Sequence, residues 1–112
     1  MQMLVAQCGP QVVAATDQIH RNELAVDQQH VKCILAVMAT AGLYDDSGKW
    51  LFHAGLPAKS GVGGGIIAAS PGKFGIAVIS PPLDDAGNSV RAQKAIADIS
   101  NALGGNPYST KK

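Results

Sequence analysis

Residues 63–80 read GGGIIAASPGKFGIAVIS, and this stretch decides the fold class. Two strand-like runs, residues 63–70 and 74–80, flank Pro71-Gly72, a dipeptide typical of tight turns, so the stretch predicts an antiparallel hairpin. The second run is apolar at nearly every position, which is typical of a strand covered on both faces. The rest of the chain, or another chain, must supply that cover.

Two helices are predicted, one on each side of the hairpin in the sequence. The first begins after Asp27 and runs to about Thr40, because apolar residues recur at the spacing of one helical face, namely Val31, Ile34, Leu35, Met38 and Gly42. Further apolar residues widen this surface, as in a helix that is covered on most sides: Ala36, Val37 and Ala39. The second helix is capped by Asn88 and ends near Leu103, with a face formed by Ala92, Ala95, Ile96, Ile99 and Leu103.

The segment between the first helix and the hairpin is predicted to be a turn followed by a strand. Asp45-Asp46-Ser47-Gly48 is a turn signal, and residues 50–54 alternate loosely, as in a short strand. Pro57 fits an edge strand or a strand start, because it has no N–H for a ladder hydrogen bond. The chain is therefore predicted to be α+β, with an antiparallel sheet and helices packed on it.

The composition is that of one small globular unit. The chain has 112 residues, of which 46% are apolar and 15% charged, and this excludes a disordered charged tail. The charged share is well below the roughly 25% of typical domains, which indicates that much of the surface is covered by something else. The net charge of +1 lacks the basic excess of nucleic-acid binders, so no nucleic acid is expected as a partner.

Cysteine usage and the apolar runs predict a cytoplasmic chain. Cys8 and Cys33 are far apart and show no CxxC spacing, so we expect reduced, mostly buried thiols. No signal peptide is recognisable at the N-terminus. The longest apolar stretch, residues 34–42, is far shorter than the roughly 20 residues needed to span a bilayer, so no membrane is expected as a partner.

The segment Lys59-Ser60-Gly61-Val62-Gly63-Gly64-Gly65 concentrates the chemical signals. A phosphate-binding loop needs its glycines before Gly-Lys-Ser/Thr and a helix after it, whereas here Lys-Ser precedes the glycines and a strand follows. A purely structural interpretation is a flexible strand entry that permits a bulge or close packing. The third interpretation is a Lys-Ser/Thr-Gly triplet on the edge strand of a serine acyl-transferase site. There the backbone N–H after the triplet donates to the developing oxyanion.

Four motifs of this chain resemble the bacterial and mitochondrial-type glutaminases. In the order and spacing of that family they are Gly42-Leu43-Tyr44, Gly55-Leu56-Pro57-Ala58-Lys59-Ser60-Gly61-Val62, Ser80-Pro81-Pro82-Leu83-Asp84 and Gly87-Asn88-Ser89. The resemblance is closest over residues 27–103. It implies that residues 1–112 are a single partial domain, the C-terminal portion of a glutaminase domain. The implied fold is that of serine β-lactamases and penicillin-binding transpeptidases, with three antiparallel strands flanked by helices.

The resemblance also implies a reaction and roles for five residues. The reaction is the hydrolysis of L-glutamine to L-glutamate and ammonia through a serine acyl-enzyme, with no cofactor and no metal. Tyr44 matches a tyrosine that contacts the substrate, and Val62 matches a position whose backbone N–H lines the oxyanion hole. Lys59, Ser60 and Gly61 match the supporting strand triplet beside the nucleophile.

The family's nucleophile has no counterpart in this chain. It lies in an upstream Ser-x-x-Lys motif, whose lysine activates the serine, whereas the Ser-x-x-Lys at Ser109 to Lys112 is at the end of the tail and cannot match that position. The isolated chain is therefore expected to be inactive. The alternatives are a truncated, non-catalytic fragment or interaction module from a split glutaminase gene, and an independent small-ligand binder. The expected partners are L-glutamine and either further copies of the chain or an N-terminal glutaminase segment.

In the resembled fold, strands from the N-terminal end pair beside the last strand. The strand expected over residues 74–80 is therefore predicted to have an open edge, or to be paired by another chain. An unpaired apolar edge favours aggregation or strand borrowing.

The remaining polar and aromatic residues are expected to have structural roles. The histidines lack metal-ligand spacing with a cysteine or carboxylate and are expected at the surface or partly buried: His20, His30 and His53. Asp84 and Asp85 are predicted to shape the loop before the last helix. Trp50 and Phe52 are predicted to be packing residues.

Overall fold

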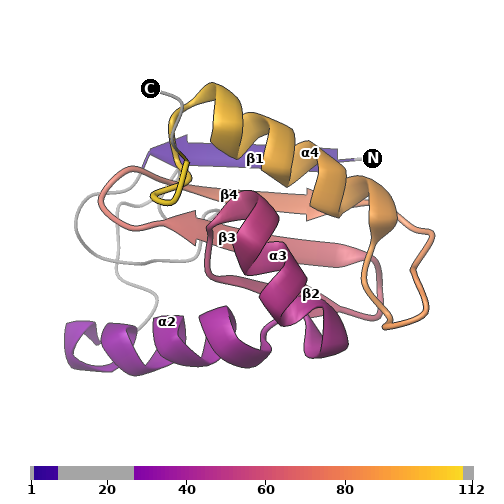
Figure 1. The fold of residues 1–112 in the computed structure, drawn as a ribbon, viewed down its shortest axis with the longest axis horizontal. Helices are drawn as coiled ribbons and strands as arrows, with labels where there is room; N and C mark the ends of the chain where they lie inside the picture. Colours follow the sequence, from indigo (N-terminus) through magenta and orange to yellow (C-terminus); the bar gives the residue numbers. More distant parts are fainter. Residues whose placement is uncertain (1, 8–26, 110–112) are drawn as a thin grey trace.

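Residues 2–7 and 27–109 are described by the computed structural model, and they form a four-stranded antiparallel sheet with helices against it (Figure 1). The strands are β1 (Gln2–Gln7), β2 (Ala58–Gly61), β3 (Gly65–Ser70) and β4 (Phe74–Ile79). The helices are α2 (Gln28–Ala41), the 3-10 helix η1 (Tyr44–Asp46), α3 (Ser47–Ala54) and α4 (Val90–Ala102). The sheet order is β1-β4-β3-β2. The predicted α+β class, with three antiparallel strands flanked by helices, is confirmed, and β1 is an additional strand.

The hairpin predicted over residues 63–80 is confirmed as β3 and β4. Its turn contains Pro71-Gly72, and the Lys73 N–H donates to the Ser70 carbonyl at 2.9 Å. Gly72 has a φ of 75°, a conformation that glycine adopts without a steric penalty because it has no Cβ. The turn chemistry that is readable in the sequence therefore fixes the register of the hairpin.

The outer edge of β4 is paired by β1. The pairing is antiparallel and runs from Gln2 opposite Ile79 to Gln7 opposite Phe74. The prediction that this edge is open, or paired by another chain, is therefore wrong. Its premise was that this chain has no strand for that position. The break at Gly9-Pro10 comes after the strand, so the preceding run QMLVAQ, which holds neither Gly nor Pro, supplies the missing ladder partners.

Residues 50–54, predicted as a short strand, belong to α3 instead. Trp50 and Ala54 lie about one helical turn apart, and both are buried. Gly55 ends the helix with a φ of 71°. The loose alternation of a five-residue run is compatible with helix and strand alike, so the pattern was not decisive. The prediction that Trp50 packs in the core is confirmed, whereas Phe52 is exposed and that prediction is wrong.

α4 is capped by Ser89 and not, as predicted, by Asn88. The Ser89 Oγ accepts a hydrogen bond from the Ala92 N–H at 3.2 Å and donates one to the Ser80 carbonyl. A serine or asparagine at the N-cap serves equally well, and here the serine hydroxyl reaches the free N–H in the first turn. Ala92 and Ile96, both on the predicted apolar face, are fully buried.

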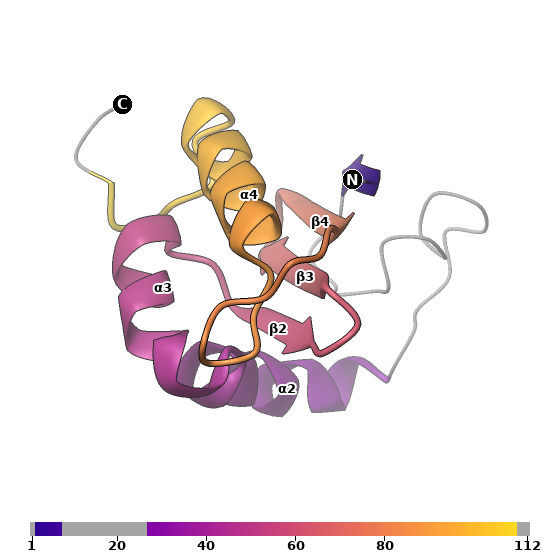
Figure 2. The ribbon, with the colours of Figure 1, turned by 90° about the vertical axis from the view of Figure 1, so that its right-hand side faces the viewer.

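α2 is confirmed over nearly its predicted length, with Asp27 as its N-cap residue. The Asp27 side chain makes no capping hydrogen bond. Val31 and Met38 are buried, whereas Val37 is exposed. Cover on most sides was predicted for this helix, and in the described part of the chain the Val37 side lacks it. Figure 2 shows α2 running beside the edge of the sheet that β2 forms.

The two faces of the sheet differ in cover. α3 and α4 lie over one face (Figure 2), and the core between these helices and the sheet includes the fully or almost fully buried Leu43, Leu56, Ile66, Ile76, Val78 and Ile96. The register places Ile67 opposite Ala77 and Ile79 opposite Gly65 on the other face. Ile67 and Ile79 are 52% and 55% exposed. The prediction that β4 is covered on both faces is thus wrong at Ile79 within the described residues.

Candidate functional site

β2 is an edge strand of the sheet and carries the triplet Lys59-Ser60-Gly61. The N–H and the Oγ of Ser60 both donate to the Gly42 carbonyl, at 3.1 and 3.3 Å, and the side chain is buried. Lys59 and Gly61 alternate with Ser60 and are exposed. Alternation along the strand therefore directs Lys59 to the open face, while the Ser60 hydroxyl joins β2 to the end of α2.

The close approach of α2 to β2 depends on Gly42. A Cβ at this position would lie 1.7 Å from the Ala58 carbonyl oxygen and 2.4 Å from the Met38 carbonyl oxygen. Both are backbone atoms that cannot move without disturbing a helix and a strand. Glycine is therefore required where the chain passes from α2 toward η1.

Tyr44 and Lys59 are brought together although they are far apart in the sequence. The Lys59 Nζ lies over the Tyr44 ring, 4.6 Å from its centroid, a cation–π contact. The same Nζ donates to the Ser60 carbonyl at 2.5 Å. Tyr44 is half exposed, so one side of its ring remains accessible to a ligand beside the ammonium group.

The backbone of Tyr44 is held in an unusual conformation. Its φ is 52°, in the left-handed region that costs a residue with a Cβ about 1–2 kcal/mol. The Ser47 Oγ accepts from the Leu43 N–H at 3.0 Å and donates to the Tyr44 carbonyl at 2.8 Å. One hydroxyl thus ties the residues on both sides of the strained φ, and the direction of the ring is set by the fold.

Val62 lies in the turn between β2 and β3 and is exposed. A Cβ added at Gly61 or Gly63 would meet no atom within 4 Å, so the backbone on both sides of Val62 borders open space. Gly64 closes the turn with its N–H on the Gly61 carbonyl at 3.0 Å and a φ of 94°. Backbone groups near Val62 are accordingly accessible to a ligand at the edge of the sheet.

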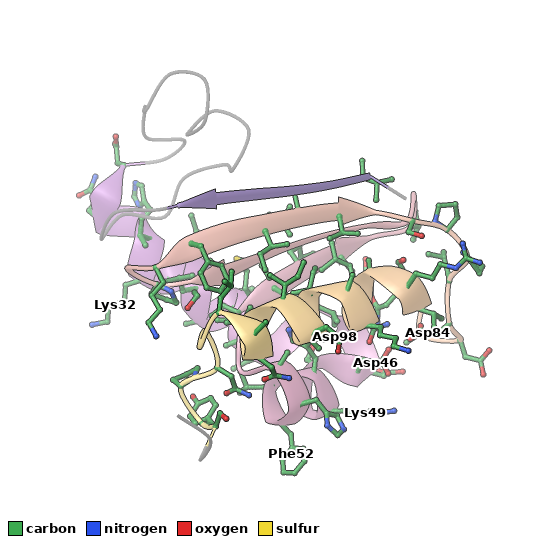
Figure 3. The ribbon with its side chains drawn as sticks, turned by 90° about the horizontal axis from the view of Figure 1, so that it is seen from above. Lys32, Asp46, Lys49, Phe52, Asp84 and Asp98 are labelled. Carbon is green, nitrogen blue, oxygen red and sulfur yellow. The ribbon has the colours of Figure 1, made fainter. Side chains whose placement is uncertain are left out.

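A cluster of polar side chains lies where η1 meets the loop before α4. Asp84 Oδ1 accepts from the Asn88 N–H at 2.9 Å and the Ala86 N–H at 3.0 Å, and Asp84 Oδ2 accepts from Gln93 Nε2 at 3.1 Å. Asn88 Nδ2 donates to Asp46 Oδ2 at 2.9 Å. Figure 3 shows Asp46 and Asp84 close together beside α4. The predicted loop-shaping role of Asp84 agrees with these bonds.

The two carboxyl groups of this cluster have pKa values shifted in opposite directions. Hydrogen bonds, first of all from the Asn88 N–H, lower the pKa of Asp84 despite partial burial. For Asp46 the hydrogen bond from the Asn88 amide lowers the pKa, but the hydrogen bond to Asp84, burial and the Asp84 charge together outweigh it and raise the pKa. Asp84 is therefore the more stable anion of the two.

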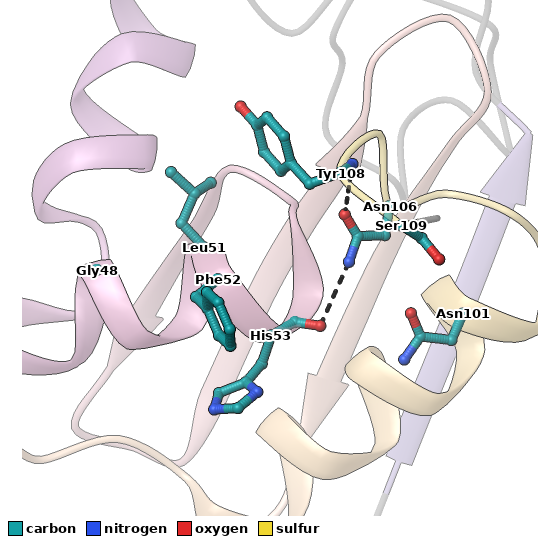
Figure 4. A pocket seen from close by; sticks show the side chains of 8 residues that line it. All are labelled: Gly48, Leu51, Phe52, His53, Asn101, Asn106, Tyr108 and Ser109. Atoms are coloured by element: carbon teal, nitrogen blue, oxygen red, sulfur yellow. Dashed lines mark hydrogen bonds between the residues drawn. The ribbon is translucent and has the colours of Figure 1, made fainter. Parts of the chain in front are cut away.

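A surface hollow of about 740 Å³ lies between α3 and the C-terminal segment (Figure 4). It is lined by Gly48, Leu51, Phe52, His53, Asn101, Asn106, Tyr108 and Ser109. Asn106 joins the C-terminal segment to α3, because its Nδ2 donates to the His53 carbonyl at 3.4 Å. Its Oδ1 accepts from the Tyr108 N–H at 2.9 Å within the C-terminal segment. None of the residues predicted for the site lines this hollow.

Metal-ligand clusters of three or more His, Cys, Asp or Glu side chains do not occur among the described residues. His30 and His53 are exposed, as predicted, and His20 lies outside the described residues. Cys33 is exposed, so the prediction of a buried thiol is wrong there, and Cys8 is outside the described residues. Within residues 2–7 and 27–109, no helix is long and apolar enough to cross a membrane.

The arrangement of these motifs agrees with the comparison with known proteins. The family model described as Glutaminase matches residues 4–108, almost the whole chain. The chain belongs to the glutaminase family. A glutaminase of Colwellia psychrerythraea is 56% identical over 98 residues, which are 86% of this chain and 32% of that protein. A glutaminase of Desulfovibrio desulfuricans is 46% identical over 104 residues, 93% of this chain and 34% of that protein.

Solved glutaminase structures share the fold of this chain. A structure described as Probable glutaminase ybaS superimposes with a TM-score of 0.73 and 50% identity, over 78% of this chain and 28% of that chain. A Bacillus glutaminase superimposes with a TM-score of 0.69 and 33% identity, over 79% and 31%. The predicted β-lactamase-like fold is confirmed by this glutaminase likeness. The chain spans about a third of the length of the curated glutaminases it matches.

Asn88 and Asp46 are the residues of the site region that sequence reasoning missed. The motif Gly87-Asn88-Ser89 is recognisable in the sequence, but its position before an apolar helical face predicts a capping role for Asn88. Its contacts with η1 join segments more than 40 residues apart, since the Asn88 amide reaches the Leu43 carbonyl at 2.8 Å. A single sequence carries no signal for such a pairing, because local turn chemistry explains the asparagine equally well.

Proposed function

We propose that residues 1–112 form a single partial domain, the C-terminal portion of a glutaminase domain, that contributes one wall of a site for hydrolysis of L-glutamine to L-glutamate and ammonia through a serine acyl-enzyme. The observation that carries the proposal is the juxtaposition of Tyr44, Lys59 and the turn at Val62 at an open sheet edge, in a chain of the glutaminase family. The reaction needs a cationic group, an oxyanion donor and a substrate contact near each other.

Each residue of this wall has a proposed task. Tyr44 contacts the substrate, and its half-exposed ring beside the Lys59 ammonium leaves room for that contact. The Val62 N–H donates to the oxyanion that develops on the substrate carbonyl, and Gly61 keeps the approach free of a side chain. Ser60 supports the wall from behind, because its buried hydroxyl binds the Gly42 carbonyl.

The nucleophile comes from elsewhere. Ser-x-x-Lys occurs in this sequence as Ser70 to Lys73 and as Ser109 to Lys112. Ser70 and Lys73 flank the turn between β3 and β4, where the buried Ser70 Oγ donates to the Gly105 carbonyl and the Lys73 Nζ donates to the Gly104 carbonyl, and Lys112 lies outside the described residues. The isolated chain is therefore proposed to be inactive, and the complete site forms when the chain pairs with an N-terminal glutaminase segment. Further copies of the chain are proposed as alternative partners that do not supply the nucleophile. The exposed apolar side chains Ile67 and Ile79, together with Val37, support a covered face in such an assembly. The proposed compartment is the cytoplasm.

A test of this proposal measures ammonia release from L-glutamine. The chain alone is compared with the chain co-expressed with the part of the Colwellia psychrerythraea glutaminase that it does not match. We expect no turnover above background for the chain alone and measurable turnover for the pair. Tyr44→Phe and Lys59→Met lower the activity of the pair, while Tyr108→Phe, a tyrosine outside the proposed wall, leaves it unchanged. Turnover by the isolated chain, or labelling of one of its serines by an active-site electrophile, would contradict the proposal.

A non-catalytic fragment or interaction module is the second candidate, and β1 favours it. β1 already occupies the edge of β4 where strands from the N-terminal end are expected in the resembled fold. A partner that adds strands there must first displace β1. Stable association of the two polypeptides without any turnover supports this candidate. Deletion of residues 1–7 then removes β1. Turnover that appears after the deletion shows that β1 blocked the edge of β4, whereas continued absence of turnover shows that the partner is incompatible.

A further inference from the structure

Asn88 is a fully buried amide between η1 and the loop that precedes α4. Its Nδ2 donates two hydrogen bonds, one to the Leu43 carbonyl at 2.8 Å and one to Asp46 Oδ2 at 2.9 Å. Its Oδ1 is buried without a hydrogen-bond partner. The polar side chain is therefore satisfied on one side only.

The side-chain hydrogen bonds of Asn88 involve its NH₂ group and not its Oδ1. Leu43 O and Asp46 Oδ2 are both acceptors, so only the NH₂ group can face them, and a flipped amide would set three oxygens against one another. A buried polar atom without a partner costs about 1–3 kcal/mol. That cost is offset by two donated bonds, one of them charge-assisted, so the donor side of Asn88 is the part that matters.

The two acceptors that Asn88 holds lie on either side of Tyr44. Leu43 precedes it, Asp46 follows two residues later, and the Asp46 N–H also donates to the Leu43 carbonyl at 3.0 Å. The Tyr44 φ of 52° persists only where its surroundings fix the neighbouring backbone. Ser47 fixes one part of this backbone and Asn88 fixes the other.

Asn88 is itself held from the opposite side. The Asn88 N–H donates to Asp84 Oδ1 at 2.9 Å, and the Asp84 N–H donates to the Asn88 carbonyl at 2.7 Å. Gln93, in the first turn of α4, donates to Asp84 Oδ2 at 3.1 Å. A continuous chain of hydrogen bonds thus runs from α4 through Asp84 and Asn88 to the segment that carries Tyr44.

We propose that Asn88 is a positioning residue for Tyr44: the Asn88 NH₂ group, bound to the Leu43 carbonyl and the Asp46 carboxylate, holds the Tyr44 ring against the Lys59 ammonium. The proposal rests on the proposed function only for the meaning of Tyr44 as a substrate contact. The geometry itself belongs to this chain and requires neither glutamine nor a partner. Asn88 is not catalytic, because it acts through Tyr44.

Fluorine NMR on the 112-residue chain tests this proposal. The chain has two tyrosines, so 3-fluorotyrosine labelling of the Tyr108→Phe variant leaves a single resonance, that of Tyr44. A Lys59→Met variant first defines the resonance position of a Tyr44 ring without its cation. We expect Asn88→Ala to move the Tyr44 resonance toward that position, with buried Trp50 fluorescence unchanged as evidence of a folded core.

A second variant separates positioning from loss of structure. Asn88→Asp keeps the shape but replaces the NH₂ donor by a carboxylate that faces two acceptors, so the resonance is displaced at pH 7. A carboxyl group buried beside Asp46 titrates with a raised pKa and regains a donor O–H when protonated. We expect the Tyr44 resonance of Asn88→Asp to return toward its original position as the pH is lowered. Asn101→Asp, at an exposed position of α4, is the matched control and leaves the resonance in place.

These NMR experiments test the positioning of Tyr44 independently of the proposed function, because they use the isolated chain without glutamine and measure no turnover. A Tyr44 resonance that stays in place in both Asn88 variants, with the core folded, overturns the proposal. So does a displacement in Asn88→Asp that does not reverse at low pH while the core remains folded. If Asn88→Ala unfolds the chain, the pH-reversible shift of Asn88→Asp alone decides.

Discussion

The two faces of the sheet show what this chain can and cannot stabilise by itself. In the core between the sheet and the helices α3 and α4, Ile66, Ile76 and Ile96 are each at most 1% exposed, whereas Ile67, on the other face of the same strand as Ile66, is 52% exposed. Alternate residues of one strand thus lie in a core and in solvent. The covered face supplies the stability of the chain, while the open face is apolar surface that an additional chain can cover.

Ile96→Ala and Ile67→Ala test this comparison with the largest expected effect. Removal of buried methyl groups leaves a cavity, so we expect Ile96→Ala to lower the free energy of unfolding by about 2–5 kcal/mol. Ile67→Ala on the open face changes it by no more than about 0.5 kcal/mol. Urea denaturation followed by Trp50 fluorescence measures both. Equal losses in the two variants would show that the open face is covered in solution.

The N-cap residues of α4 and α2 differ in the same way as the two faces of the sheet, and removal of each side chain tests the difference. Ser89 caps α4 on the covered face with a hydrogen bond to the Ala92 N–H, whereas Asp27 precedes α2 without a side-chain bond. We expect Ser89→Ala to lower the free energy of unfolding by about 1 kcal/mol, and Asp27→Ala by less than about 0.5 kcal/mol. A larger loss for Asp27→Ala in urea denaturation contradicts the described cap.

The contact between Lys59 and Tyr44 lies at the edge of the sheet that β2 forms, and both side chains are exposed. A cation–π contact at an exposed site stabilises by about 0.5–1 kcal/mol. We expect a double-mutant cycle of Lys59→Met and Tyr44→Leu to give a coupling free energy of that size. The matched cycle with Lys94→Met, an exposed lysine of α4, gives none. Coupling that is equal in both cycles rules out a specific contact.

Asp46→Asn has the smallest expected effect, and its sign depends on pH. Because the pKa of Asp46 in the folded chain lies above its ordinary value of 3.8, the ionised carboxylate at neutral pH opposes folding. Asparagine can still accept from Asn88, so we expect Asp46→Asn to raise the free energy of unfolding at pH 7 by a few tenths of a kcal/mol. The gain fades as the pH falls through the raised pKa toward 3.8 and Asp46 takes up its proton.

Urea denaturation at neutral pH and near pH 3.5 measures this change. Asp98→Asn controls for the loss of one negative charge next to α4. The lowered pKa of Asp84 acts in the opposite sense, because the stability it contributes is present at neutral pH and lost as the pH falls through its folded value. A gain for Asp46→Asn that is larger at acidic than at neutral pH contradicts the direction given for Asp46.

Local signals in the sequence were sufficient for the hairpin and for both long helices. Pro71-Gly72 determines a turn through its own backbone preferences, and the apolar spacing around Val31 and Met38 requires a helix. The run at residues 50–54 was misjudged because five residues fit both periods. The pairing of β1 with β4 and the burial of Asn88 depend on contacts across the whole chain, and neither residue type nor spacing encodes them.

Some features of the candidate site can likewise be predicted from local sequence, whereas others depend on contacts between distant segments. The motifs around Tyr44 and Lys59 come together in the structure, because the Lys59 ammonium lies over the Tyr44 ring, while the roles of these residues and of Val62 remain a proposal. The opposite directions of Lys59 and Ser60 follow from strand alternation and could have been predicted from the edge strand itself. The link from Asp84 through Asn88 to Tyr44 could not, because it requires knowledge of which loop lies against η1.

The pairing of β1 with β4 puts any incoming strand in competition with a strand of the same chain. β1 is joined covalently to the rest of the chain, so its effective concentration at the edge of β4 is on the order of millimolar. A free polypeptide at micromolar concentration competes poorly with a tethered one. A free strand therefore displaces β1 only at high concentration or with a much higher affinity for the edge of β4.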